Sequence, residues 1–159
     1  SKNIDVTPSF YNIHFIFQKV LGDDMGFLPW RDHGINPYGN SIIANGKYLS
    51  ANRATVEKFV KITQKSYADC VKTPDPCVAA LVTANSGLKT GSSMKNWELV
   101  TELMNDKTSR TVALGHFDDT RMGADYKMIE TYFNLGKPFD IKGAYTNAFL
   151  ENTIKFPAK

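Results

Sequence analysis

The spacing of apolar residues changes near Asn45, and this change limits the possible folds more than any other feature of the chain. After Asn45, apolar residues recur in steps of three and four, the spacing of one face of an α-helix. Before Asn45, apart from one helical stretch at residues 12–21, they occur in short runs bounded by glycine and proline, a pattern that favours short strands and loops. The sequence therefore predicts a helix-rich α/β fold with few strands.

The strands that we expect are few for the number of helices. They cover residues 4–10, 26–30 and 41–44, the first as a strand or an edge segment. A free-standing α/β domain normally alternates strands and helices along its whole length. We therefore expect these helices to pack on a sheet that is built partly by other residues.

Each predicted helix has an apolar face that we expect to be buried. The helices cover residues 12–21, a long segment capped by Ser50 or Asn52, a segment opened by Asp75 and Pro76, a segment opened by Ser92 or Ser93, and a last long segment capped by Asp118 or Asp119. In the long segment after Asn52 the apolar face holds Val56, Phe59, Val60, Thr63, Tyr67, Cys70 and Val71. In the last segment it holds Met122, Tyr126, Ile129 and Phe133. Gly22 is expected to end the first helix.

The two cysteines, Cys70 and Cys77, are spaced seven residues apart, which matches no zinc or redox motif. The burial habits of cysteine favour two half-buried thiols. The alternative is a disulfide, which would form if Pro74 and Pro76 turn the chain back between two helices. In an oxidising compartment such a bond would fix that turn.

Composition and charge exclude some classes of function. The chain has 159 residues, 42% of them hydrophobic, and a formal net charge of +3. Lysine and arginine are scattered singly along the chain, whereas binding to nucleic acid needs clustered cations, so we expect no nucleic-acid partner. The apolar runs are too short to cross a bilayer as a helix.

No arrangement of residues in the sequence demands catalysis. There is no glycine-rich phosphate loop and no serine in a nucleophile elbow. The histidines, His14, His33 and His116, are isolated from one another and from carboxylates at helical spacing. We therefore predict a protein that is not an enzyme, with no catalytic residue, no metal ligand and no cofactor.

Two segments carry candidate ligand-binding residues. Tyr11 and Asn12 stand where an extended segment passes into a helix, and ligands of open α/β sheets lie beyond such strand ends. An aromatic face and an amide suit a small polar solute or a flat heterocycle. Tyr38, Gly39 and Asn40 form a polar loop, in which glycine allows close backbone approach. Ordinary packing with an asparagine cap, and a purely structural turn, remain the alternatives.

Several of the same stretches resemble the nitrate, sulfonate, taurine and thiamine-precursor-binding proteins of ABC importers. The run Asp32-His33-Gly34-Ile35-Asn36-Pro37-Tyr38-Gly39-Asn40, the strand Ile42-Ile43-Ala44 and the helix opening Ala51-Asn52-Arg53-Ala54-Thr55-Val56 follow the order of that family. The segment Gly115-His116-Phe117-Asp118-Asp119-Thr120-Arg121-Met122 is similar to its Gly-x-x-Asp-x-x-Arg-Met stretch. Tyr145-Thr146-Asn147-Ala148-Phe149-Leu150 is similar to the family's closing motif.

The resemblance implies the C-terminal half of a type II periplasmic-binding-protein fold, in which two α/β lobes enclose a ligand cleft. Residues 1–45 would finish the second lobe and its crossing strand, and residues 46–159 would return helices to the first lobe. The partners implied are a small-molecule solute, an ABC permease, and either the missing N-terminal half or a second copy of the chain. The implied location is the periplasm, or the cell exterior as a membrane-anchored lipoprotein.

Two alternatives remain beside solute binding. One is an enzyme on the same fold that resembles the thiamine-pyrimidine synthases, although the chain lacks the cysteine-rich run of those relatives. The other is an interaction module that binds no small molecule. Ile13-His14-Phe15 also stands where binders of pyrimidine precursors often carry an acidic residue, which argues against that ligand.

Overall fold

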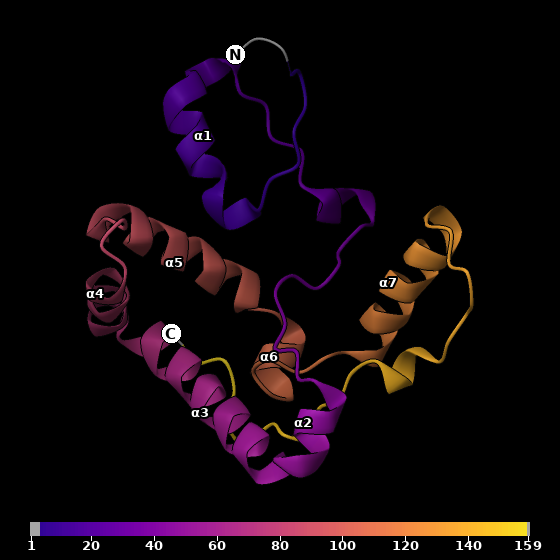
Figure 1. Ribbon diagram of the computed structural model, residues 1–159. Helices are drawn as coiled ribbons and strands as arrows, with labels where there is room; N and C mark the ends of the chain where they lie inside the picture. Colours follow the sequence, from indigo (N-terminus) through magenta and orange to yellow (C-terminus); the bar gives the residue numbers. More distant parts are fainter. Residues whose placement is uncertain (1–3, 159) are drawn as a thin grey trace.

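Helices make up the regular secondary structure of the computed structural model, which describes residues 4–158 (Figure 1). The α-helices are α1 (His14–Leu21), α2 (Gly46–Ala51), α3 (Arg53–Lys72), α4 (Pro74–Ala84), α5 (Thr90–Met104), α6 (Lys107–Thr111) and α7 (Asp119–Tyr132). Short 3₁₀ helices are η1 (Tyr11–Ile13), η2 (Gly22–Asp24), η3 (Trp30–His33) and η4 (Ile141–Gly143). The expectation of a helix-rich chain is confirmed.

The strands predicted for residues 4–10, 26–30 and 41–44 are not formed, since residues 4–158 contain no strand. Most of these residues are irregular, and Trp30 begins η3 instead. The physical reason is that a strand is defined by hydrogen bonds to a neighbouring strand. Within the described part of the chain no two of these segments pair, so they lack the backbone hydrogen bonds that would make them strands.

Several predicted helix ends agree with the structure. Gly22 follows α1 with φ of 60°, a backbone conformation that glycine adopts readily. Asp118 caps α7 and accepts a hydrogen bond from the Arg121 N–H at 2.9 Å. α4 begins at Pro74, two residues before the predicted start, because proline is favoured in the first turn of a helix.

Two other N-terminal helix caps were not predicted from the sequence. Asn45 accepts hydrogen bonds from the Lys47 and Tyr48 N–H groups and so begins α2. Asp106 and Ser109 form a reciprocal capping box, which begins α6 in a segment for which no helix is predicted above.

The buried core is small and lies where the C-terminal tail crosses α3. Ala68, Leu114 and Phe156 form its centre, and Leu114 and Phe156 are 4% and 5% exposed. The Leu114 N–H donates to the Ile154 carbonyl at 2.9 Å, and the Phe156 N–H donates to the Ser109 carbonyl at 2.9 Å. The tail is therefore fastened to the helices by its backbone.

The predicted buried faces of two helices are partly wrong. In α3, Phe59 is 57% exposed and Tyr67 43% exposed, while the buried positions are Val56, Gln64 and Ala68. In α7 none of the predicted apolar residues is buried, and Phe133, which follows the last residue of the helix, is 63% exposed. Helical spacing tells which residues share a face, but it does not tell whether this chain supplies anything to cover that face.

The cysteines form a disulfide, so the preference for free thiols is wrong. Cys70 and Cys77 are joined across the turn between α3 and α4, with their Cα atoms 5.8 Å apart. Pro74 at the start of α4 follows the turn that brings them together. The bond fixes the α3–α4 corner, on which α5 packs.

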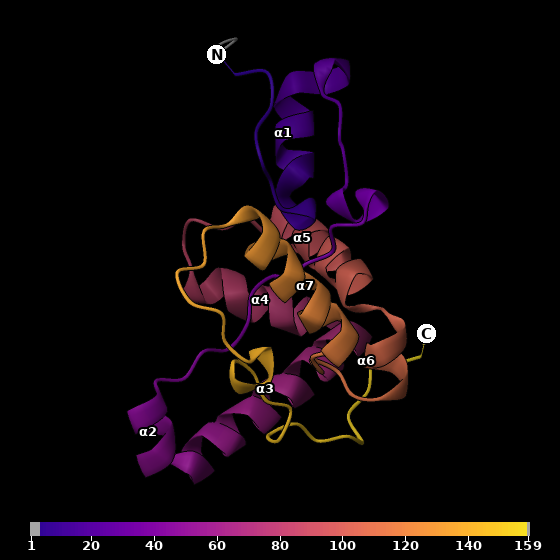
Figure 2. The same cartoon turned by 90° about the vertical axis from the view of Figure 1, so that its right-hand side faces the viewer.

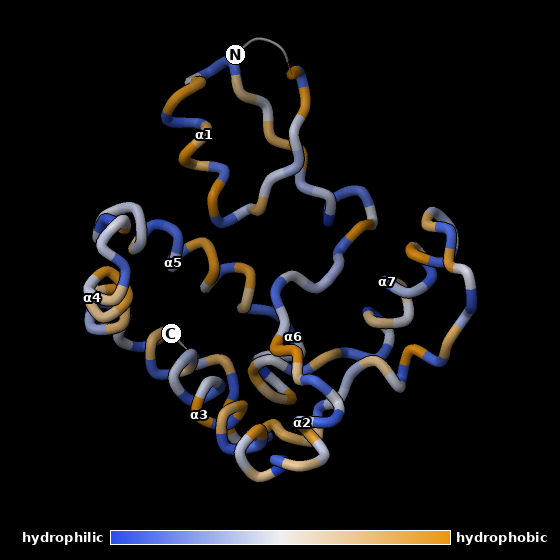
Figure 3. The backbone as a smooth tube through the Cα atoms, in the orientation of Figure 1, coloured by the Kyte–Doolittle hydropathy of each residue, from blue (hydrophilic) through white to orange (hydrophobic). Residues whose placement is uncertain are grey.

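α5 lies between the N-terminal segment and the α3–α4 corner (Figures 1 and 2). α1 and its flanking loops extend away from the other helices in both views, and η1 at the start of α1 contacts α5. Hydrophobic residues recur at intervals along α1 and α5 (Figure 3). Much of this apolar surface is open, since Ile16, Phe17, Val20 and Leu21 of α1 are each more than 40% exposed.

Candidate functional site

The first predicted segment, Tyr11 and Asn12, is held by two side chains of α5. The Tyr11 hydroxyl donates to Oε2 of Glu102 at 3.1 Å. Nδ2 of Asn96 donates to the Asn12 carbonyl at 3.0 Å. These contacts join residues that are 91 and 84 positions apart in the sequence, so α5 fixes the place of η1.

Aromatic rings and one cation surround Tyr11. We call Tyr11, His14, Phe27 and Arg31 the Tyr11 cluster. The His14 and Phe27 rings stack with centroids 4.5 Å apart, and the Tyr11 and Phe27 centroids are 5.8 Å apart. Cζ of Arg31 lies 5.1 Å from the Tyr11 ring centroid. Rings, an imidazole and a guanidinium at one place can stack on a flat solute and attract an anionic one.

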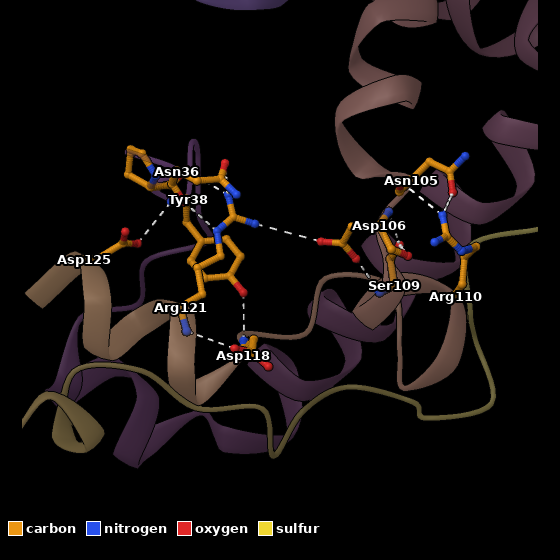
Figure 4. Close-up of polar contacts among 10 residues, drawn as sticks. Asn36, Tyr38, Asn105, Asp106, Ser109, Arg110, Asp118, Arg121 and Asp125 are labelled. Carbon is orange, nitrogen blue, oxygen red and sulfur yellow. Dashed lines mark hydrogen bonds and ion pairs between the residues drawn. The ribbon is translucent and has the colours of Figure 1, made fainter. Parts of the chain in front are cut away.

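The second predicted segment packs on α7 through Tyr38 (Figure 4). The Tyr38 N–H donates to Oδ2 of Asp125 at 3.2 Å, and the Tyr38 hydroxyl accepts from the Asp118 N–H at 2.8 Å. Cζ of Arg121 lies 4.0 Å from the centroid of the Tyr38 ring. We call Tyr38, Asp118, Arg121 and Asp125 the Tyr38 cluster.

Arg121 fastens the loop before Tyr38 to α7. Its Nε donates to the Asn36 carbonyl at 2.7 Å, and its Nη2 donates to the Pro37 carbonyl at 3.0 Å and to Oδ1 of Asn36 at 3.2 Å. Its Nη1 lies 3.9 Å from Oδ2 of Asp106 (Figure 4). The planar guanidinium matches several acceptors at once, which a lysine ammonium at this position would not do.

Arg121, Asn96 and Glu102 are functional-site residues that no individual pattern in the sequence indicates. Arg121 does lie in one of the stretches that resemble the family, so that resemblance was the available signal. Asn96 and Glu102 lie among the polar positions of a helix and have no motif around them. Their contacts with residues more than 80 positions away follow only from the packing of α5.

Two tyrosine hydroxyls near α7 have raised pKa values. Burial is the main cause of the raised pKa of Tyr38. The Tyr145 hydroxyl donates to Oδ1 of Asp119 at 2.7 Å, and this hydrogen bond raises the pKa of Tyr145 to about 12. The ring of Phe117 contacts both tyrosine rings edge-on. Near pH 7 both hydroxyls are therefore neutral and keep their hydrogen-bonding roles.

The structure places the five predicted ligand-binding residues in two groups. Tyr11 and Asn12 form hydrogen bonds with α5, and Tyr38 forms one with the residue that caps α7. Gly39 has open space where a Cβ atom would lie, and Asn40 is exposed. No hydrogen bond or ring contact between described residues joins one group directly to the other.

An apolar groove lies beside the end of the second segment. It has a volume of about 460 Å³, and its lining includes residues 42–45, Tyr48, Val56 and Phe59. Ile43 in its wall is 91% exposed. Backbone groups of residues 41–44 form no hydrogen bond with other described residues. The groove therefore offers the unpaired backbone of residues 41–44 next to apolar residues.

The histidines of the described chain are in separate places. His14 belongs to the Tyr11 cluster, and Nε2 of His116 lies 3.3 Å from the Asn147 amide. Residues 4–158 contain no group of three or more His, Cys, Asp or Glu side chains arranged to hold a metal ion. In the same residues, no helix combines the length and the apolar character needed to cross a membrane.

Comparison with known proteins finds a similarity in the N-terminal part of the chain. The model of a family described as "NMT1/THI5 like" matches residues 1–77, a range that contains all five predicted ligand-binding residues. The searches of curated proteins and of solved structures found no match. The matched range is a little under half of the 159 residues, and over it the chain is similar to the NMT1/THI5-like family, the nitrate, sulfonate, taurine and thiamine-precursor-binding family that the sequence resembles.

Proposed function

We propose that this chain is part of the solute-binding component of an ABC importer and is not an enzyme. It would capture a small polar or anionic solute, or a heterocycle similar to a thiamine precursor, between the Tyr11 and Tyr38 segments. The observation that carries this proposal is the position of both segments in the family-matched region, each anchored to a different helix. Two separately anchored segments can approach a solute from two sides.

The chemistry of the two segments supports a binding role. Tyr11 would stack on the solute, Asn12 and Asn40 would form hydrogen bonds, and Gly39 would allow close approach of the backbone. Arg31 beside Tyr11, whose Nε also lies 3.8 Å from Oδ1 of Asp32, would supply the cation for an anionic group such as a sulfonate. Closure of the two segments would exclude water and strengthen these few polar contacts.

The complete cleft in this proposal includes residues that pair with the extended segments of the chain. Residues 41–44 have unpaired backbone and border an apolar groove, which is the environment of a strand without its sheet. A neighbouring strand would come from a missing N-terminal half or from a second copy of the chain. The result would be the two-lobed α/β fold, with residues 1–45 in one lobe and residues 46–159 returning to the other.

The disulfide supports a location outside the cytoplasm. Disulfides form and persist in oxidising compartments such as the periplasm and the cell exterior, where proteins of this family typically act. In that setting the protein would be periplasmic, or a lipoprotein anchored to the outer surface of a membrane. It would deliver its solute to a membrane permease.

Isothermal titration of the purified protein with three probes tests the proposal: taurine, nitrate and an aminopyrimidine. We expect one probe to bind, and Tyr11→Ala to weaken that binding about tenfold because the stacking surface is lost. Tyr132→Ala is the matched control, since Tyr132 is 79% exposed and lies at the end of α7. Binding by none of the probes, or equal affinity in Tyr11→Ala, would contradict the proposal.

A spectroscopic control separates binding from catalysis. An enzyme similar to the thiamine-pyrimidine synthases would retain pyridoxal phosphate on a lysine and would show its visible absorbance band. We expect no such band from the purified protein after incubation with pyridoxal phosphate and desalting. A stable band that sodium borohydride removes would favour the enzyme.

A further inference from the structure

We infer that Asn96 and Glu102 of α5 are positioning residues, which set the orientation of Tyr11 and Asn12 for the solute. The inference rests on the proposed function, and it adds two residues outside the family-matched range of residues 1–77. Neither residue needs to touch the solute. Each acts through a hydrogen bond to the segment that does.

The two contacts constrain different parts of the segment. Asn96 donates to the Asn12 carbonyl and so fixes the backbone of η1. Glu102 accepts from the Tyr11 hydroxyl and so fixes the far end of the ring. A backbone and a ring that are both fixed leave Tyr11 with one orientation, which lowers the entropy lost when a solute stacks on it.

Charge strengthens the second contact. A hydrogen bond from a neutral hydroxyl to a carboxylate is stronger than one between neutral groups. No ion pair with another described residue occupies Glu102, whereas Glu98, one turn earlier in α5, pairs with Lys95 at 3.1 Å. Glu102 is therefore the carboxylate of this helix that faces the segment, and Glu98 provides a matched comparison.

The position of α5 is itself set by the disulfide-linked corner. Nε1 of Trp97, the residue after Asn96, donates to the Cys70 carbonyl at 3.2 Å. The Trp97 and Tyr67 ring centroids lie 5.8 Å apart. Cys70 is joined to Cys77, so the α3–α4 corner is covalently fixed. α5 packs on this corner and in turn holds Tyr11 and Asn12. Figure 1 shows α5 running from the α4 side towards the middle of the molecule.

The experiment combines amide NMR spectra with the titration described above. We expect Asn96→Ala and Glu102→Ala to move the amide resonances of Tyr11, Asn12 and His14, because the anchoring hydrogen bonds are lost. Glu102→Gln should restore much of the wild-type spectrum, since its amide oxygen still accepts from Tyr11. Glu98→Ala should leave these resonances unchanged. Unmoved resonances in both Asn96→Ala and Glu102→Ala would overturn the inference.

The affinity measurement separates positioning from simple stability. For the probe that binds, and at a temperature at which every variant is folded, Asn96→Ala and Glu102→Ala should each weaken affinity about fivefold, as expected for loss of one hydrogen bond, while Glu98→Ala leaves the affinity unchanged. Moved resonances with unchanged affinity would overturn the positioning role. If no probe binds the wild type, the proposed function fails, and the NMR spectra alone decide whether α5 positions the segment.

Discussion

The side-chain amide of Gln64 forms hydrogen bonds in both directions with the backbone of Glu151. Its Oε1 accepts from the Glu151 N–H at 2.9 Å, and its Nε2 donates to the Glu151 carbonyl at 3.1 Å. Nε2 also donates to the Leu114 carbonyl at 2.9 Å. Gln64 is 5% exposed, so these backbone groups are paired away from water and the tail is fixed to α3.

Replacing Gln64 with alanine should therefore destabilise the protein strongly. The change leaves the Leu114 carbonyl without this partner in a buried place and the Glu151 backbone groups without theirs in a half-buried one, which costs about 2–3 kcal/mol of unfolding free energy. Urea unfolding followed by circular dichroism measures this difference. Gln18→Ala is the matched control, because Gln18 is exposed on α1. Equal midpoints for the two variants would contradict the structural role of Gln64.

Removing the disulfide should lower stability by about 2 kcal/mol. The bond closes only a short loop, so it restricts the unfolded chain less than a long-range bond would. The measurement is urea unfolding of the wild type with and without reductant, beside a variant with Cys70→Ser and Cys77→Ser. We expect reductant to lower the midpoint of the wild type and to leave that of the double variant unchanged. A reductant effect of equal size in both proteins would contradict the assignment.

The Tyr145 hydroxyl should ionise with a pKa of about 12 instead of the ordinary 10. The hydrogen bond to Asp119 favours the neutral hydroxyl in the folded protein. A pKa raised by folding stabilises the protein fully below pH 10, and this contribution is lost as the pH rises from 10 to 12. Ultraviolet titration of the wild type minus Tyr145→Phe isolates this group. Asp119→Asn should move its titration towards pH 10, and a Tyr145 titration at 10 in the wild type would contradict the contact.

Arg121→Lys should loosen the loop that carries Tyr38. Lysine cannot serve the Asn36 and Pro37 carbonyls together as the guanidinium does. We expect hydrogen exchange of the Tyr38 amide to accelerate about tenfold, since opening of the loop breaks its hydrogen bond to Asp125. Arg110→Lys, on the surface of α6, is the control and should leave this amide unchanged. No acceleration in Arg121→Lys would show that other contacts hold the loop.

The ends of some helices could be predicted from the sequence, because they depend on residues that are adjacent in the chain. Gly22 ends α1 and Asp118 caps α7 because the chemistry of a helix end involves only adjacent residues. Whether the disulfide forms depends on whether the chain turns back at Pro74, and the burial habits of cysteine favoured the wrong alternative.

Long-range contacts could not be predicted in this way. Gln64 occupies a buried position where the apolar pattern gives no hint of a polar side chain, because its partners are backbone groups about 50 and 87 residues away. Residues 41–44 have the composition of a strand, but no described segment pairs with them. Phe59 has the spacing of a core residue and is exposed beside the groove. The contact between Tyr11 and α5 likewise could be recognised only in the folded structure.

Native mass spectrometry of the purified protein, compared with denaturing mass spectrometry of the same sample, tests most directly whether the chain serves a shared solute-binding cleft. We predict a native mass above that of one chain, with a second polypeptide or a second copy, or a small molecule, released on denaturation. In the Tyr11→Ala variant, the small molecule should dissociate under milder conditions than in the wild type. A native mass equal to one 17.8 kDa chain at every concentration, with nothing released, would contradict the account.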